Sequence, residues 1–276
     1  LHDLAHKTGQ NRERQIMCAS PVSITRLEGN HPPMSDQERE TRVNLAAMYR
    51  LIAHYDMDDK TSTHISARVP GTDDQFLLNP EGRLFHQMRA SDLIKINLEG
   101  QILDDTPDTV IRAGYVIHSA IMGARPDVEC CVHTHTTAGM AVSALECGLL
   151  PVNQKSMRFV ADMAYHNYEG YATDLEERDR LVADLGTRNW IILRNHGLLV
   201  TAPSMWSAFR WSYSLETACR VQVAAMNTGG ALNLPDMDVV KYTAKQANRP
   251  RDHITPPAEW HSHLEMLDRA DPGFRD

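Results

Sequence analysis

The sequence predicts one mixed α/β or α+β domain rather than two separate domains. Predicted strands and helices follow one another without strict alternation, and no Gly- or Pro-rich linker divides the central part of the chain. A chain of 276 residues is long enough to bury one large core. We expect an N-terminal arm over residues 1–34, a core domain over 35–228, and a C-terminal tail over 229–276 that packs on the domain or on a neighbouring subunit.

The first predicted helix covers residues 35–55. Ser35 and Glu38 have the spacing of a capping box, and apolar residues follow at helical spacing. Short strands separated by turns are expected between residues 63 and 103. The turns are indicated by Pro70-Gly71, Pro80-Glu81-Gly82 and Glu99-Gly100.

The rest of the chain alternates between helical periodicity and short apolar runs. Helices are predicted over 109–124, 175–186 and 204–226, with one short helix in the tail over 258–267. Buried strands are predicted over 128–135 and over 189–201, the second one broken at Asn195-His196-Gly197.

Composition and charge exclude several classes of protein. The net charge of −8 argues against a nucleic-acid partner, because phosphate binding needs a clustered positive surface. No apolar run approaches the roughly 18 residues of a membrane span, so no membrane partner is expected. The five cysteines do not form the pattern of a disulfide framework, which predicts a reduced, cytoplasmic compartment.

The run "CCVHTH" places His133 and His135 two residues apart on a predicted strand, so both side chains point to the same face. They either bind one metal ion together or form hydrogen bonds at a strand end. His196 follows another apolar strand, and three neutral imidazoles are a common set for a catalytic divalent metal. His261 and His263 have the same spacing on a predicted helix, where they face apart and are expected at the surface.

Three segments resemble the class II aldolase/adducin family in order and separation: "HISARVPG" with "LLNPEG", "RPDVECCVHTHTTAGMAVSAL", and "ILRNHGLLV". The resemblance covers approximately residues 36–228. It implies a three-layer α/β/α fold with a central, largely antiparallel sheet, and a homotetramer with active sites between subunits. It also implies one divalent ion per chain, held by His133, His135 and His196. Zinc is the expected ion, with manganese, cobalt, nickel and iron as alternatives.

The resemblance also implies a reaction type. A divalent ion chelated by a carbonyl oxygen and its neighbour stabilises the enolate that forms when an adjacent bond breaks. The sequence departs from the sugar-phosphate aldolases at three places. Gly114 stands where they carry a catalytic glutamate, Thr63-His64 replaces a phosphate-binding Gly-Asn pair, and Arg112-Ala113 replaces two serines. These changes favour a decarboxylase or retro-aldolase acting on a small, unphosphorylated hydroxy or oxo carboxylate.

The remaining candidate site residues follow from their places in the resembling segments. Arg112 suits a substrate carboxylate, and its alternative is an exposed helix position. His118 and Asn79 are assigned to substrate binding, with a structural role as the alternative for His118. The candidate catalytic side chains, other than the metal ligands, are His64, Tyr115, Lys155 and Glu169.

Two other functions stay open at this point. One is a sugar-phosphate aldolase or epimerase of the same family. The other is a non-catalytic interaction module like the head of adducin, which lacks the metal-binding histidines. An amidohydrolase with a TIM barrel is excluded, because the His-x-His pair lies mid-chain and too little βα repetition follows it.

Overall fold

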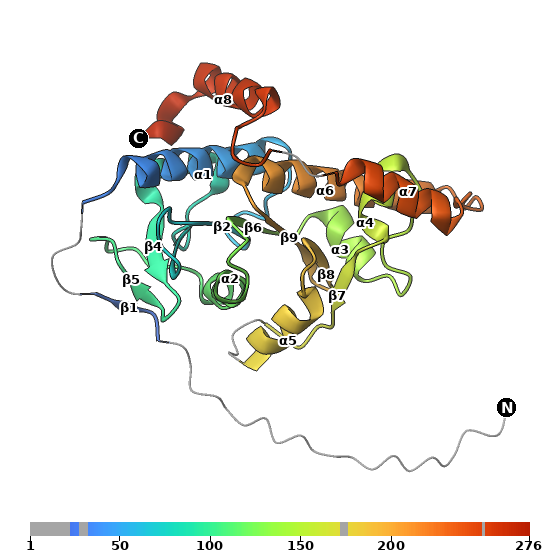
Figure 1. Cartoon of the computed structure of the whole chain (residues 1–276), viewed down its shortest axis with the longest axis horizontal. Coiled ribbons are helices and arrows are strands. Elements are labelled where there is room, and N and C mark those ends of the chain that lie inside the picture. The colour runs from blue at the N-terminus through green and yellow to red at the C-terminus, as the bar shows by residue number, and fades with distance from the viewer. Residues whose placement is uncertain (1–22, 28–32, 172–175, 250–251) are drawn as a thin grey trace, which may run out of the picture.

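The computed structural model describes residues 23–27, 33–171, 176–249 and 252–276. Its centre is one nine-stranded sheet with the order β1-β5-β4-β3-β2-β6-β9-β8-β7 (Figure 1). The strands are β1 (Thr25–Arg26), β2 (His64–Arg68), β3 (Gln75–Leu78), β4 (Ile94–Asn97), β5 (Gln101–Ile102), β6 (Cys130–Thr134), β7 (Ala164–His166), β8 (Trp190–Leu193) and β9 (Gly197–Ala202).

Most neighbouring strands in this sheet are antiparallel. The two exceptions are β1 with β5 and β7 with β8. The segment 189–201, expected as one broken strand, is the antiparallel hairpin β8–β9, and Asn195 takes a left-handed conformation (φ 55°) in its turn. The expectation of a largely antiparallel sheet is therefore confirmed.

Helices cover both faces of the sheet. On one face lie α1 (Asp36–His54) and α6 (Met205–Asn227), and on the other lie α2 (Arg112–Ala124) and α5 (Glu176–Leu185) (Figure 1). Strand alternation divides the apolar side chains between the two cores: Cys130 and Val132 face α1 and α6, whereas Cys131 faces α2. The predicted three-layer α/β/α fold is confirmed.

Several short elements were not predicted from the sequence. They are α3 (Thr137–Ser143), α4 (Gln154–Val160), β1, β7, and the 3₁₀ turns η1 (Phe85–Gln87) and η2 (Ala90–Asp92). A helix of seven residues makes about two turns, which is too short for a periodic pattern. The local signal for α4 is its cap, because the Asn153 side chain accepts hydrogen bonds from the backbone N–H groups of Lys155 and Ser156.

The C-terminal segment contains more structure than the single short helix expected. It forms α7 (Met237–Ala247), α8 (Ala258–Ala270) and the 3₁₀ turn η3 (Pro272–Arg275), so the expectation of one helix was wrong. Helix α7 buries only Val240 and Ala244. Trp260 of α8 and Phe274 of η3 are buried in the core that α1 forms. Most of the predicted N-terminal arm lies outside the described residues.

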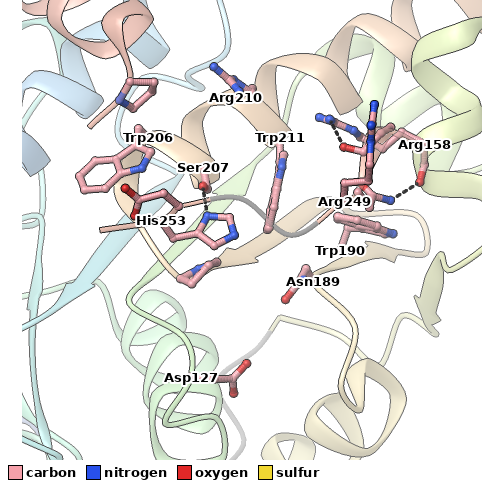
Figure 2. A pocket seen from close by; sticks show the side chains of 15 residues that line it. Asp127, Arg158, Asn189, Trp190, Trp206, Ser207, Arg210, Trp211, Arg249 and His253 are labelled. Carbon is pink, nitrogen blue, oxygen red and sulfur yellow. Dashed lines mark hydrogen bonds between the residues drawn. The ribbon is translucent and has the colours of Figure 1, made fainter. Parts of the chain in front are cut away.

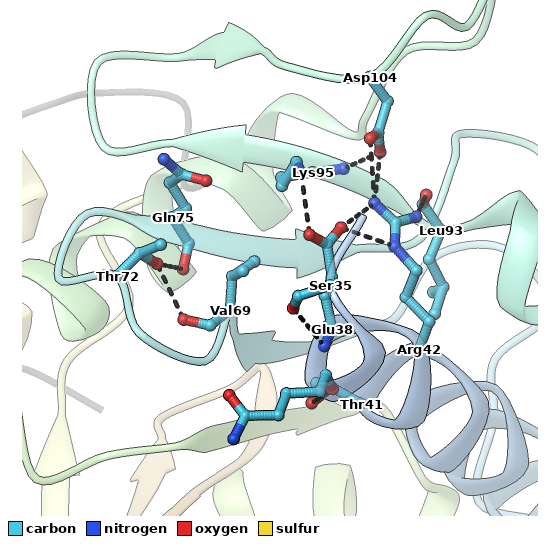
Figure 3. Close-up of polar contacts among 11 residues, drawn as sticks. Ser35, Glu38, Thr41, Arg42, Val69, Thr72, Gln75, Leu93, Lys95 and Asp104 are labelled. Carbon is cyan, nitrogen blue, oxygen red and sulfur yellow. Dashed lines mark hydrogen bonds and ion pairs between the residues drawn. The ribbon is translucent and has the colours of Figure 1, made fainter. Parts of the chain in front are cut away.

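A buried group of charges lies where α1 begins (Figure 3). The Glu38 carboxylate accepts hydrogen bonds from the Arg42 guanidinium at 2.9 Å and from Lys95 Nζ at 3.0 Å. Arg42 also donates to Asp104 at 2.8 Å. We call these four residues the ionic cluster. It joins α1 to β4 and to the segment after β5.

Within the described part of the chain, no helix is both long and apolar enough to cross a membrane. Cys130, Cys131 and Cys219 are buried free thiols, and Cys147 is an exposed one. Burial raises the pKa of Cys131 and of Cys219 well above the ordinary value of a thiol, so both stay protonated.

Candidate metal centre

Three histidines meet where β6 ends beside the β8–β9 turn. His133 is in β6, His135 follows it by two residues, and His196 is in the turn that leads into β9. Gly197 makes this approach possible, because a Cβ at that position would lie 2.4 Å from the carbonyl oxygen of Thr134. The antiparallel pairing of β6 with β9 therefore brings together residues that are about 60 positions apart in the sequence.

The three Nε2 atoms of this triad converge on one point. The Nε2 atom of His133 lies 2.8 Å from that of His135 and 3.2 Å from that of His196, and the latter two are 2.9 Å apart. Tetrahedral zinc with bonds of about 2.1 Å separates its nitrogen ligands by about 3.4 Å. Among the described residues, these three form the one group of potential ligands close enough to share an ion.

Hydrogen bonds on the outer side of the imidazole rings determine which ring nitrogen carries the proton. His133 Nδ1 donates to the carbonyl oxygen of Leu198 at 3.0 Å, and His135 Nδ1 donates to the Asp59 carboxylate at 3.3 Å. Both rings therefore present a bare Nε2 lone pair to the centre. Facing lone pairs repel one another unless a cation lies between them, so the donor set fits a divalent metal ion.

The protonation states of the three rings suit metal binding. Burial lowers the pKa of His133 and of His135, although Asp59 raises the latter. Burial and the neighbouring His135 and His166 lower the pKa of His196 to about 4. All three rings are therefore neutral at neutral pH, which is the form that binds metals.

The triad lies in the wall of a cavity of about 490 Å³. Polar and apolar side chains from separate parts of the chain complete the wall. They are Thr61, Ser62, His64, Glu81, Ile111, Ala113, Ile117, Met140, Tyr168, Tyr171 and Asn195, with the backbone of Gly170. The start of α2 therefore reaches the cavity, and the positive end of a helix dipole favours a bound anion.

His64 is the predicted catalytic residue that lies nearest the triad. Its ring centroid is 4.9 Å from that of His133, and the two residues are paired across β2 and β6. On the other side, His64 Nδ1 is 2.7 Å from His118 Nε2, and His118 Nδ1 is hydrogen-bonded to Ser66 Oγ. His118 is fully buried and does not line the cavity.

Three other predicted residues lie on elements around the cavity, but their side chains do not line it. Arg112 starts α2 between two residues that do. Tyr115 is buried and donates a hydrogen bond to the carbonyl oxygen of Leu98 at 2.6 Å, which directs it into the core. The Asn79 side chain is buried and accepts a hydrogen bond from Tyr49.

The structure places Lys155 and Glu169 further out. Lys155 is exposed on α4, with its Nζ 5.0 Å from the centre of the Tyr213 ring. Glu169 lies in a small hollow beside His196, and Arg180 donates to its carboxylate at 2.9 Å. Neither side chain reaches the triad within this one chain.

Asp59 and Ser66 were not predicted as residues of the site, and Tyr168 was indicated only as part of the segment 164–170. Tyr168 lines the cavity, with its ring centroid 6.2 Å from that of His196. Asp59 lies in a polar turn before β2, and nothing in that turn distinguishes it from its neighbours. His261 is exposed, as expected, but the expected surface position of His263 was wrong. His263 is half-buried, because its ring packs against Tyr55 and Phe209 and its Nε2 lies 3.1 Å from the Tyr55 hydroxyl.

A second cavity, of about 420 Å³, lies at the opposite ends of the same strands (Figure 2). Trp190, Trp206 and Trp211 line it, together with several charged side chains. Those charges have partners within the chain, since Arg210 pairs with Glu259 and Asp127 pairs with Arg125. Residues of α4, α6 and the C-terminal segment line this cavity, and none of the triad does.

Comparison with known proteins gives a consistent result. Residues 43–223 match the family model described as "Class II Aldolase and Adducin N-terminal domain". An aldolase II superfamily protein from Pseudomonas syringae is 46% identical, with a TM-score of 0.83 over 88% of this chain and 97% of that one. L-fuculose 1-phosphate aldolase from Glaciozyma antarctica is 28% identical, with a TM-score of 0.75 over 89% of this chain and 97% of that one.

The chain is also similar to an adducin. It is 42% identical to mouse alpha-adducin over 212 residues, which are 75% of this chain and 29% of that protein. The chain thus spans less than a third of alpha-adducin, and its identity to that segment exceeds its identity to the Glaciozyma aldolase.

Proposed function

Because the chain belongs to the class II aldolase/adducin family, we propose that it is a divalent-metal-dependent lyase. We propose as its substrate a small, unphosphorylated hydroxy or oxo carboxylate, cleaved by decarboxylation or retro-aldol reaction. The observation that carries the proposal is the triad, whose three Nε2 atoms lie within 3.2 Å of one another in a cavity wall. An interaction module gains nothing from facing lone pairs, whereas a metal enzyme requires them.

The proposed metal has one chemical task. When bound by His133, His135 and His196, a divalent ion supplies the positive charge that stabilises an enolate-type anion next to a carbonyl group. Asp59 holds His135 with its lone pair toward the ion, and the Leu198 carbonyl does the same for His133. Zinc suits three neutral nitrogen ligands with an open position.

The cavity also favours an anionic substrate. The first turn of α2 reaches its wall through Ile111 and Ala113, and a helix N-terminus attracts a carboxylate. Arg112 lies between these two residues and is the proposed carboxylate partner. We propose that Lys155 and Glu169 act in an assembled homotetramer, where a neighbouring chain completes the cavity.

Elemental analysis tests the metal first. We expect about one divalent ion per wild-type chain, an equal content in His261→Ala, and almost none in His133→Ala. Metal-bearing protein is then screened for carbon dioxide or aldehyde release from unphosphorylated carboxylates and, in parallel, from sugar phosphates. Turnover of sugar phosphates alone would replace the proposed substrate class with that of the sugar-phosphate aldolases.

The second candidate is an adducin-like interaction module, and the identity to alpha-adducin favours it. This alternative predicts a wild-type protein that contains no metal even after reconstitution with zinc, manganese or cobalt. It also predicts that triad substitutions leave every measured property except local stability unchanged.

A further inference from the structure

Four residues lie behind the triad, and three of them form a chain of hydrogen bonds that leads toward the cavity. Ser66 and His64 are on the same face of β2, His118 is on α2, and Gly114 lies one turn before His118. Ser66, His118 and His64 are joined in that order by hydrogen bonds, and the last of them lines the cavity beside the triad.

Gly114 is required for this arrangement. A Cβ at that position would lie 2.9 Å from Cδ2 and 3.0 Å from Cγ of His64. The His64 ring is held from behind by His118 and cannot turn aside freely. Because Gly114 has no side chain, α2 leaves the space that the His64 ring occupies.

The buried hydroxyl of Ser66 sets the direction of the chain. Its hydrogen needs an acceptor because an unsatisfied buried hydroxyl costs about 1–3 kcal/mol. The one acceptor that the described residues offer is His118 Nδ1. His118 consequently carries its proton on Nε2 and donates to His64 Nδ1, which leaves the His64 proton on Nε2.

We infer that Ser66, His118 and Gly114 position His64 as a neutral N–H donor that binds a substrate oxygen next to the metal. This inference rests on the proposed function and adds a residue role to it. The triad offers lone pairs to the cation, whereas His64 offers a hydrogen to the oxygen that becomes negative. Burial lowers the pKa of His118 to about 3, so the ring that holds His64 from behind stays neutral.

Nuclear magnetic resonance of the zinc-loaded protein labelled with ¹⁵N-histidine tests the tautomer directly. Long-range ¹H–¹⁵N spectra, with His64 assigned by comparison with His64→Asn, should show its proton on Nε2. In Ser66→Ala the preference should be lost, so that signals of both His64 tautomers appear, while Ser66→Thr should retain the wild-type pattern. A His64 proton on Nδ1 in the wild type, or an unchanged spectrum in Ser66→Ala, would overturn the inference.

Binding of oxalate, a planar dicarboxylate that mimics an enolate, tests the role at the cavity. By calorimetry we expect Ser66→Ala and Gly114→Ala to bind oxalate roughly tenfold more weakly than wild type at equal zinc content. Oxalate affinities equal to wild type in both variants would contradict the inferred contact. If zinc-loaded wild type shows the Nε2 tautomer but binds no oxalate, the proposed carboxylate substrate fails and the positioning of His64 stands.

Discussion

Two groups of polar side chains are buried in this domain, one where α1 begins and one where β6 and the β8–β9 turn meet. In the ionic cluster, the Glu38 carboxylate receives hydrogen bonds from Arg42 and Lys95, so each charge has an opposite charge beside it (Figure 3). In the triad, three Nε2 atoms of neutral rings face one another. The charges of the ionic cluster pair with one another within the chain. The facing Nε2 atoms of the triad instead need a cation, which the chain does not supply.

This difference separates a structural role from a functional one. Burying a paired charge contributes little net stability, but breaking the pair is costly because the remaining charge stays buried. Burying facing lone pairs is unfavourable until a cation binds, and that unfavourable term is recovered on binding. Substitutions in the ionic cluster should therefore change stability without changing metal content, and substitutions in the triad should do the opposite.

The largest expected effect is on metal binding by His196→Ala. Removing one of three ligands should lower zinc affinity by more than about 10³-fold, because loss of an outer hydrogen bond alone costs 10–100-fold. Calorimetric zinc titration measures this, with His261→Ala as the matched control. In excess chelator the variant should unfold at no lower temperature than wild type, since one of the facing lone pairs is gone. A large loss of stability in chelator would show that the triad is a structural group like the ionic cluster.

Glu38→Ala should give the next largest effect. It leaves Lys95 and Arg42 buried with fewer partners, and we expect the free energy of unfolding in urea to fall by about 3–5 kcal/mol. Glu40→Ala, an exposed glutamate on the same helix, should change it by less than about 0.5 kcal/mol. Zinc content should equal that of wild type in both. A fall in zinc content at retained folding would remove the proposed separation between the two groups.

The same two groups show what the sequence predicted and what it did not. Ser35 and Glu38 were interpreted as a capping box, and Ser35 Oγ does accept a hydrogen bond from the Glu38 N–H at 3.1 Å. The Glu38 side chain, however, turns to Lys95, which is 57 residues away in the sequence. A local motif predicted the helix start correctly, but tertiary packing decided the partner of the carboxylate.

For the site, the strand period places His133 and His135 on one side, and the family resemblance adds His196. The hydrogen-bond partners of these rings were not predictable, because the register of β2 against β6 and the packing of α2 on the sheet decide them. Gly114 illustrates this limit. From the sequence it indicates only a missing glutamate, whereas the structure shows the His64 ring in the space above it.

Asp59→Asn should have a smaller effect than loss of a ligand. The carboxylate holds His135 by a hydrogen bond at 3.3 Å and makes the Nε2 lone pair of its ring a more basic metal ligand. We expect zinc affinity to fall by about 10–100-fold with little change in stability. Asp58→Asn is the control, since Asp58 has no contact with the triad among the described residues. Equal affinities in wild type and Asp59→Asn would mean that His135 is oriented by packing alone.

The smallest expected effect is on the pH dependence of stability and concerns His166. This buried histidine differs from the triad because carboxylates lie beside it. Glu177 lies 3.5 Å from Nε2 and Asp184 lies 2.7 Å from Nδ1. These two carboxylates raise the pKa of His166 above its ordinary value, which opposes the lowering by burial.

A raised pKa in the folded state stabilises the protein at low pH. The contribution is fully present below the unfolded pKa of about 6.5 and is lost as the pH rises through the raised folded value. Asp184→Asn lowers that folded value, so the variant should be less stable than wild type by up to about 1 kcal/mol below pH 6.5. The difference should narrow as the pH rises.

Urea unfolding at several pH values measures this difference in stability, with exposed Asp179→Asn on the same helix as the control. A difference that is constant with pH would show that Asp184 contributes an ordinary hydrogen bond to a neutral ring, as Leu198 does for His133.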